Sequence, residues 1–113
     1  MARPLRFSEL SPPRQVLVRL SQVLNFGHIQ GIRVRDANPV FDPQPIVLVE
    51  ERLDVRDEPR PELELTDFVL SEEVCRLMER LDEINNGTIE RIEVRAGVPR
   101  RISFQSRLPE ALG

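Results

Sequence analysis

The sequence contains an internal repeat, and this feature limits the folds open to the chain more than any other. When residues 11–39 are aligned with residues 71–99, 60 positions further on, nine of the 29 positions are identical. A chain of this composition would give roughly two by chance. The identical pairs are Ser11/Ser71, Leu17/Leu77, Asn25/Asn85, Gly27/Gly87, Ile29/Ile89, Ile32/Ile92, Val34/Val94, Arg35/Arg95 and Pro39/Pro99. Such a repeat predicts two copies of one small structural unit packed against each other.

Each copy begins with a predicted helix. Ser11 and Ser71 are typical N-cap residues, and Pro12 suits the first helical position. Gly27 is expected to end the first helix, because glycine adopts the left-handed conformation without strain. The apolar stripe of the first helix is predicted to comprise Val16, Leu20, Val23 and Leu24, widened by Leu17 and Val18. The stripe of the second comprises Val74, Leu77, Met78, Leu81 and Ile84.

Alternating residues after each helix predict strands. The second copy predicts a hairpin, residues 89–95 and 98–107, around a turn at Ala96-Gly97. The first copy predicts a strand over residues 28–35 and, after a turn and an insertion, another over residues 45–52. This last strand has four apolar residues in a row, Ile46 to Val49, a pattern typical of strands buried on both faces. We therefore expect it to be central in the sheet or covered from outside.

These elements predict an α+β fold and a single domain spanning residues 1–113. Repeat one covers residues 11–53, a charged linker covers residues 54–62, and repeat two covers residues 63–107. Neither α-β-β repeat can bury its helix stripe alone, so the two should form one mostly antiparallel sheet about a pseudo-twofold axis, with both helices on one face. Residues 1–10 are expected to form an arm or an edge strand.

The order of helix, glycine and hairpin with a turn glycine resembles the small uncharacterised YezD-like bacterial proteins. The residues that carry the resemblance are Gly27/Gly87, Ile29/Ile89, Ile32/Ile92, Val34/Val94 and Gly97. The chain looks like two such units fused over residues 11–107. It departs from the family at the step from Ile89 to Ile92, which predicts a β-bulge, and at Ala37, where a turn glycine is expected. The family carries no established activity, so the resemblance implies a fold and no chemistry.

The sequence gives no reason to expect an enzyme, a cofactor or a metal. There is one histidine, His28, and one cysteine, Cys75, so a zinc ligand set is not expected. Cys75 lies in the first turn of the second helix, where the helix dipole could lower its pKa, but it also pairs with Leu70 in a predicted hydrophobic staple, which favours a buried, inert thiol. Nothing places His28 beside it. A single cysteine, no long apolar run and no signal peptide favour the cytosol.

The charge distribution favours an association function. Residues 36–83 carry fifteen acids and five arginines, between two basic ends. Contact between the parts, or head-to-tail contact between chains, suits this pattern better than a nucleic-acid stripe. The candidate interaction face comprises Ile46 and Leu48 with the neighbouring Arg33 and Arg35, and its expected partner is a second copy of the chain or another protein. The alternative is that the first ten residues, through Leu5 and Phe7, cover Ile46 and Leu48.

Two further functions remain open from the sequence. The outer face of the second hairpin carries the candidate anion-binding residues Arg91, Arg95, Arg101 and Arg107. Nucleic acid is not favoured there, because single-strand binding sheets usually supply aromatic stacking platforms and this face has none. A small-ligand pocket at the interface of the two repeats is the other candidate, since duplicated folds create a cleft there.

Overall fold

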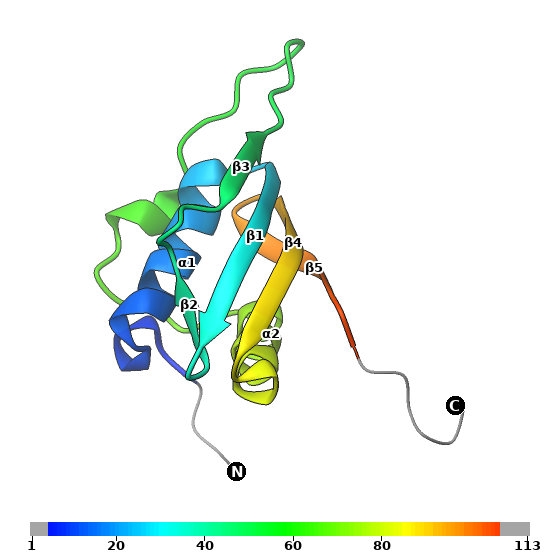
Figure 1. Cartoon of the computed structure of the whole chain (residues 1–113). Coiled ribbons are helices and arrows are strands. Elements are labelled where there is room, and N and C mark those ends of the chain that lie inside the picture. Colours follow the sequence, from blue (N-terminus) through cyan, green and yellow to red (C-terminus); the bar gives the residue numbers. More distant parts are fainter. Residues whose placement is uncertain (1–4, 107–113) are drawn as a thin grey trace.

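The computed structural model describes residues 5–106 and shows an α+β fold (Figure 1). The helices are α1 (Pro12–Leu24) and α2 (Glu72–Ile84), with two 3-10 turns, η1 (Phe7–Glu9) and η2 (Pro61–Glu64). The strands are β1 (Gly27–Arg35), β2 (Asn38–Val40), β3 (Ile46–Val49), β4 (Gly87–Arg95) and β5 (Val98–Phe104). All pairings are antiparallel in the order β2-β1-β4-β5, and β3 pairs with the part of β1 that β2 leaves free.

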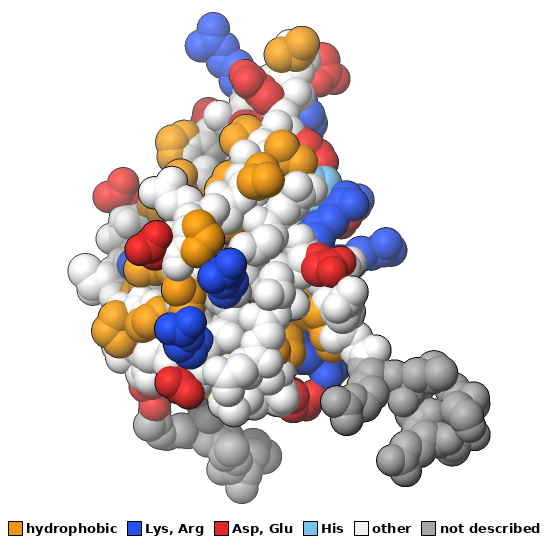
Figure 2. All heavy atoms as spheres, viewed as in Figure 1, with side chains coloured by type: hydrophobic (Ala, Val, Ile, Leu, Met, Phe, Trp, Pro, Cys, Tyr) orange, Lys and Arg blue, Asp and Glu red, His pale blue; other side chains and the backbone are white. Residues whose placement is uncertain are grey.

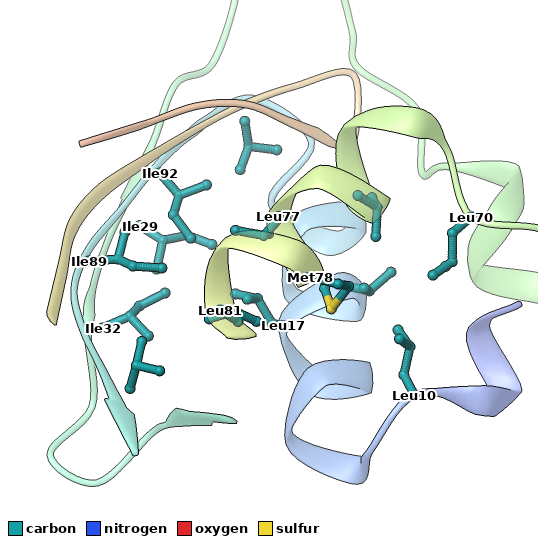
Figure 3. Packing of buried hydrophobic residues seen from close by; sticks show 14 of the residues in the cluster. Leu10, Leu17, Ile29, Ile32, Leu70, Leu77, Met78, Leu81, Ile89 and Ile92 are labelled. Atoms are coloured by element: carbon teal, nitrogen blue, oxygen red, sulfur yellow. The ribbon is translucent and has the colours of Figure 1, made fainter. Parts of the chain in front are cut away.

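Both helices cover one face of the sheet, and the core lies between the two layers. Figure 3 shows Leu17 and Leu81 from the two helices facing the isoleucines of β1 and β4. The side chains of Leu17, Leu81, Ile29, Ile32, Ile89 and Ile92 are completely buried. Because this core draws on α1, β1, α2 and β4 alike, neither half of the chain could bury its apolar face alone.

The central strand pair has a symmetrical register. Gly27 lies opposite Val94, and Val34 lies opposite Gly87, so each strand meets the other at equivalent positions of the aligned sequence. The hairpin turns obey the same symmetry: the Ala37 N–H donates to the Asn85 carbonyl, and the Gly97 N–H donates to the Asn25 carbonyl. This is the geometry of a pseudo-twofold axis. That the halves are copies of one unit stays a prediction from the sequence.

The second hairpin forms as expected, and the register between its two strands shifts twice. The register between β4 and β5 shifts between Ile89 and Arg91, which confirms the predicted bulge. A second shift, between Glu93 and Val94, places Pro99 rather than Arg100 opposite the buried Val94.

The helix ends differ from the prediction. Asn25 ends α1 and Asn85 ends α2, and both have positive φ, of 64° and 58°. At the end of α1 the sequence predicted Gly27 for this left-handed position. Asparagine tolerates this conformation better than most residues. Gly27 instead begins β1.

The face that α1 buries agrees with the prediction only in part, since Leu17, Val18 and Leu24 are buried as expected. Val16 and Val23 are 50% and 68% exposed, whereas Leu17, Ser21 and Leu24 face the core. Both sets satisfy helical spacing, and the buried set was obscured by the serine in its middle. Ser21 is accommodated because its hydroxyl donates to the Leu17 carbonyl at 3.1 Å. For α2 the predicted stripe is the buried one.

The segment before α1 packs against the segment before α2. Phe7 is buried and stacks on Phe68 with 4.9 Å between ring centroids, and the Phe7 N–H donates to the Phe68 carbonyl. Asp67 stabilises this contact, because its carboxylate accepts hydrogen bonds from Arg6 Nε at 2.8 Å and from the Ser8 N–H at 2.9 Å. These contacts tie the N-terminal segment to the helix layer.

Asp67 should therefore make this segment sensitive to acid. The Arg6 guanidinium, together with the Ser8 N–H, lowers the pKa of Asp67 from 3.8 to about 2. A lowered pKa contributes stability above the unfolded-state value, and this contribution is lost as pH falls through the folded-state value. In Asp67→Asn we expect the free energy of unfolding to be lower than in the parent above pH 4, and this difference to shrink between pH ~4 and ~2. Urea unfolding across this range measures it; a difference independent of pH would contradict the assignment.

Candidate functional site

The strand β3 is the most exposed apolar element of the sheet. The exposed fractions of Ile46, Val47, Leu48 and Val49 are 60%, 38%, 46% and 69%. The expectation that this strand is central or covered is wrong for the described chain: it lies at the edge, next to β1 only. The strand is also shorter than predicted, since it ends at Val49 instead of continuing to residue 52. A separate strand that the sequence did not predict, β2, precedes it, and the chain leaves the sheet between Val40 and Ile46. Figure 2 shows hydrophobic side chains gathered over β3.

The outer edge of β3 offers unused backbone groups. The Glu50 N–H donates to the Phe26 carbonyl at 2.9 Å, which marks the hydrogen-bonded phase of this antiparallel ladder. Alternate residues share that phase, so Leu48 and Ile46 direct their backbone groups toward β1. Val47 and Val49 lie in the other phase and direct their N–H and C=O groups away from it. A further strand could pair with them there.

Other sheet edges carry protective features that β3 lacks. β5 contains Pro99 and two arginines, of which Arg100 pairs with Glu73 of α2 at 2.5 Å. Next to β3, β2 contains Pro39 and is only three residues long. Proline, charge and short length are the usual ways in which proteins block an edge. β3 has no proline and no charged residue within its four positions.

The N-terminal segment does not cover β3. Leu5 and Phe7, the residues proposed to do so, pack instead against the core in the helix layer. Residues 1–4 lie outside the described part of the chain. Among residues 5–106, β3 therefore keeps its apolar side chains in solvent.

Two arginines lie on the same sheet face as Ile46 and Leu48. Ile32 and Val34 point into the core, so Arg33 and Arg35, which alternate with them on β1, project from the open face. Arg33 lies opposite Val40 of β2. Both arginines are exposed, and neither forms an ion pair within residues 5–106. The four residues of the predicted interaction face thus share one surface.

The candidate anion-binding face is partly neutralised by its own neighbours. Arg95 pairs with Glu93 at 3.0 Å, and an Arg91 guanidinium nitrogen lies 2.8 Å from His28 Nε2. Arg101 lies opposite Glu93 on the neighbouring strand.

Arg107, the fourth residue of the candidate anion-binding face, lies outside the described residues. His28 lies 3.4 Å from Glu50 and 3.8 Å from Glu93, which adds two carboxylates to this region. Anion binding stays a prediction, with less unpaired positive charge to support it than the sequence indicated.

Cys75 and His28 lie on opposite sides of the sheet. Cys75 is in the helix layer, and burial together with nearby Glu79 and Glu72 raises the pKa of its thiol. His28 is on the open face, beside Glu50. The structure therefore brings together no nucleophile–base pair from these two residues. Within residues 5–106 no cluster of three or more histidine, cysteine or carboxylate side chains could hold a metal ion.

A hollow of about 810 Å³ lies between the two halves. Its apolar lining includes Leu10, Cys75 and Met78, and Arg14 spans it by pairing with Asp82 at 2.5 Å. It lies where the small-ligand hypothesis put a pocket. Its polar lining includes Glu9, Asn38 and Glu79, and the small-ligand hypothesis stays a prediction.

Comparison with known proteins gives no relative from which a function could be carried over. No family model, no curated protein and no solved structure matches the chain. The resemblance to the YezD-like proteins therefore stays a prediction. Neither α1 nor α2 is long and apolar enough to cross a membrane, and residues 5–106 contain no other α-helix.

Proposed function

We propose that this protein is a small interaction module that works by self-association through β3. The observation that carries the proposal is the run of four exposed apolar residues, Ile46–Val49, on an edge strand with unused backbone groups. Adding a strand to such an edge satisfies the backbone and removes the side chains from water together. We also propose that the protein is cytosolic, and its single cysteine, the free thiol of Cys75, supports this location.

A second copy of the chain suits this edge because β3 is complementary to itself. In an antiparallel pair centred on Leu48, Val47 of one copy meets Val49 of the other, and both direct their backbone groups into the new ladder. The two Leu48 side chains meet at the centre on the open sheet face, and the two Ile46 side chains lie on that face as well. A twofold arrangement of this kind closes on itself and leaves neither β3 edge exposed.

Charged residues at the edge should abolish association. The double variant Val47→Lys/Val49→Lys places two like charges on each copy at the proposed interface, without touching a residue of the buried core. We expect the parent to be a dimer of the 13.1 kDa chain and the variant to be a monomer with unchanged circular dichroism. Light scattering on the eluting protein over a range of concentrations measures the mass.

Val16→Lys is the matched control, because Val16 is 50% exposed but lies on α1, outside both β3 and the loop that follows it. It should leave the dimer intact. A parent protein that stays monomeric at high micromolar concentration would overturn the proposal. A Val47→Lys/Val49→Lys variant that still dimerises would also overturn it.

A further inference from the structure

The acidic loop after β3 projects away from the body of the molecule. It runs through residues 50–58 and forms the extension at the top of Figure 1. Arg52 pairs with Asp57 at 2.5 Å within the loop, and this hydrogen bond raises the Arg52 pKa. Glu50, Glu51, Asp54 and Glu58 remain as further acids against a single further arginine, Arg56. The loop therefore presents net negative charge at a distance from the sheet.

The arginines of β1 differ from several other arginines of the described chain, which pair with carboxylates. Arg6, Arg14 and Arg100 each pair with a carboxylate, at 2.8, 2.5 and 2.5 Å. Arg33 and Arg35 project from the open face without such a partner within residues 5–106. Figure 2 shows basic side chains on this face below the hydrophobic group over β3. Within residues 5–106 the protein thus carries a basic site without ion pairs and a projecting acidic loop.

We infer that in the dimer the acidic loop of each copy contacts Arg33 and Arg35 of the other. The inference rests on the proposed self-association through β3. Two antiparallel β3 strands run in opposite directions, so the loop that follows β3 of the second copy continues past Ile46 of the first. Along β1, Ile46 lies opposite Gln30, and Arg33 lies three residues further on in that same direction.

The spacing of the strands allows the contact. With the two Leu48 residues opposite each other, Glu50 of the second copy lies opposite Ile46, and the loop that follows it continues toward the Arg33 end of β1. Glu51 and Asp54 are the acids of that loop that first pass this end. One strand separates β1 from the second copy, which amounts to about 10 Å at ordinary strand spacing. An arginine and a glutamate side chain together span this distance. The twofold axis forms the contact twice.

A charge swap tests the inference. Arg33→Glu/Arg35→Glu places acid against acid in both contacts of its dimer, and Glu51→Arg/Asp54→Arg places base against base. We expect each variant alone to dimerise roughly 10- to 100-fold more weakly than the parent. A mixture of the two should recover the parent's affinity as a heterodimer, because both contacts then pair opposite charges. Analytical ultracentrifugation of each variant and of the mixture measures the dissociation constants.

Arg95→Glu/Arg101→Glu is the matched control, since it makes the same change of net charge on the same sheet face but over β4 and β5. It should leave the dimer as strong as in the parent. Charge-swap variants that dimerise like the parent, or a mixture that fails to recover, would overturn the contact while leaving association through β3 in place. A parent that is monomeric, or a dimer insensitive to Val47→Lys/Val49→Lys, would overturn both.

Discussion

Replacing Gly27 with alanine is expected to destabilise the protein by about 2–4 kcal/mol and to release β3 from β1. Gly27 has φ of +151°, a backbone conformation that other residues rarely adopt. A Cβ atom there would lie 2.0 Å from the Leu48 carbonyl oxygen and 3.0 Å from Leu24 Cδ1. The Leu48 oxygen belongs to the backbone of β3, so it cannot move aside unless the strand moves.

Urea unfolding measures the loss of stability, and hydrogen exchange locates it. The amides of Leu48 and Glu50, which bond toward β1, should exchange faster in Gly27→Ala than those between β4 and β5. The variant should also lose the dimer, since a displaced β3 can no longer present its outer edge. A variant with normal protection at Leu48 would contradict this account of the glycine.

Gly87→Ala is the matched control, because Gly87 occupies the same position in the second half of the sequence. It lacks the positive φ of Gly27, and its added Cβ would meet only the side-chain atom Ile84 Cγ2, at 3.1 Å. Its expected cost is about 1 kcal/mol or less. The contrast arises because β3 packs over Gly27, whereas Gly87 pairs with Val34 at the opposite end of the central pair. Equal losses in the two variants would mean that the β3 contact is unimportant.

The parts of the fold that the sequence predicted are those encoded by neighbouring residues. Ser71 accepts a bond from the Val74 N–H, as an N-cap should. Ala96 and Gly97 both take positive φ, which is the requirement of a two-residue hairpin turn. The break in alternation between Ile89 and Ile92 predicted the bulge. Each of these signals spans only a few residues.

The position of β3 could not be predicted in the same way. A run such as Ile46–Val49 indicates a strand whose side chains should be buried on both faces. It does not indicate whether another part of the chain or another molecule buries them. The position of β3 depends on the segment between Val40 and Ile46, where the chain leaves the sheet and so separates β3 from β2 at the sheet edge. Alternation within each strand pairs Ile46 with Leu48 and Arg33 with Arg35, but only the register, with Leu48 opposite His28 and Ile46 opposite Gln30, places the two pairs on one face.

Contacts between residues far apart in the chain were also not predicted from the sequence. The Arg19 guanidinium stacks over the rings of Phe7 and Phe68, at 4.5 and 5.3 Å. It also donates to the carbonyls of Glu62 and Leu65. No spacing rule connects these positions, because they come from three separate segments: the turn that contains Phe7, the helix α1, and residues 62–68. An arginine on a helix is usually a solvated side chain, so its role in joining the segments before and after it is visible only in the folded protein.

The orientation of α1 gives the second large predicted effect. Leu17 is completely buried, so Leu17→Ala removes side-chain volume from the centre of the core and should cost about 3 kcal/mol of stability. Val23 belongs to the stripe that the sequence pattern favoured, but it is 68% exposed. Val23→Ala should therefore change stability by no more than about 0.5 kcal/mol.

Urea unfolding of both variants, at dilutions where the parent is monomeric, decides between the two faces of α1. Dilution matters because dimerisation would add a concentration-dependent term to the apparent stability. A larger loss in Val23→Ala than in Leu17→Ala would mean that α1 is rotated so that Val16, Leu20 and Val23 meet the sheet. The rotation would then bury the apolar stripe and expose Ser21, whose hydroxyl now bonds within the helix. The opposite result, a large loss in Leu17→Ala alone, follows from the packing of Leu17 against Leu81 in Figure 3.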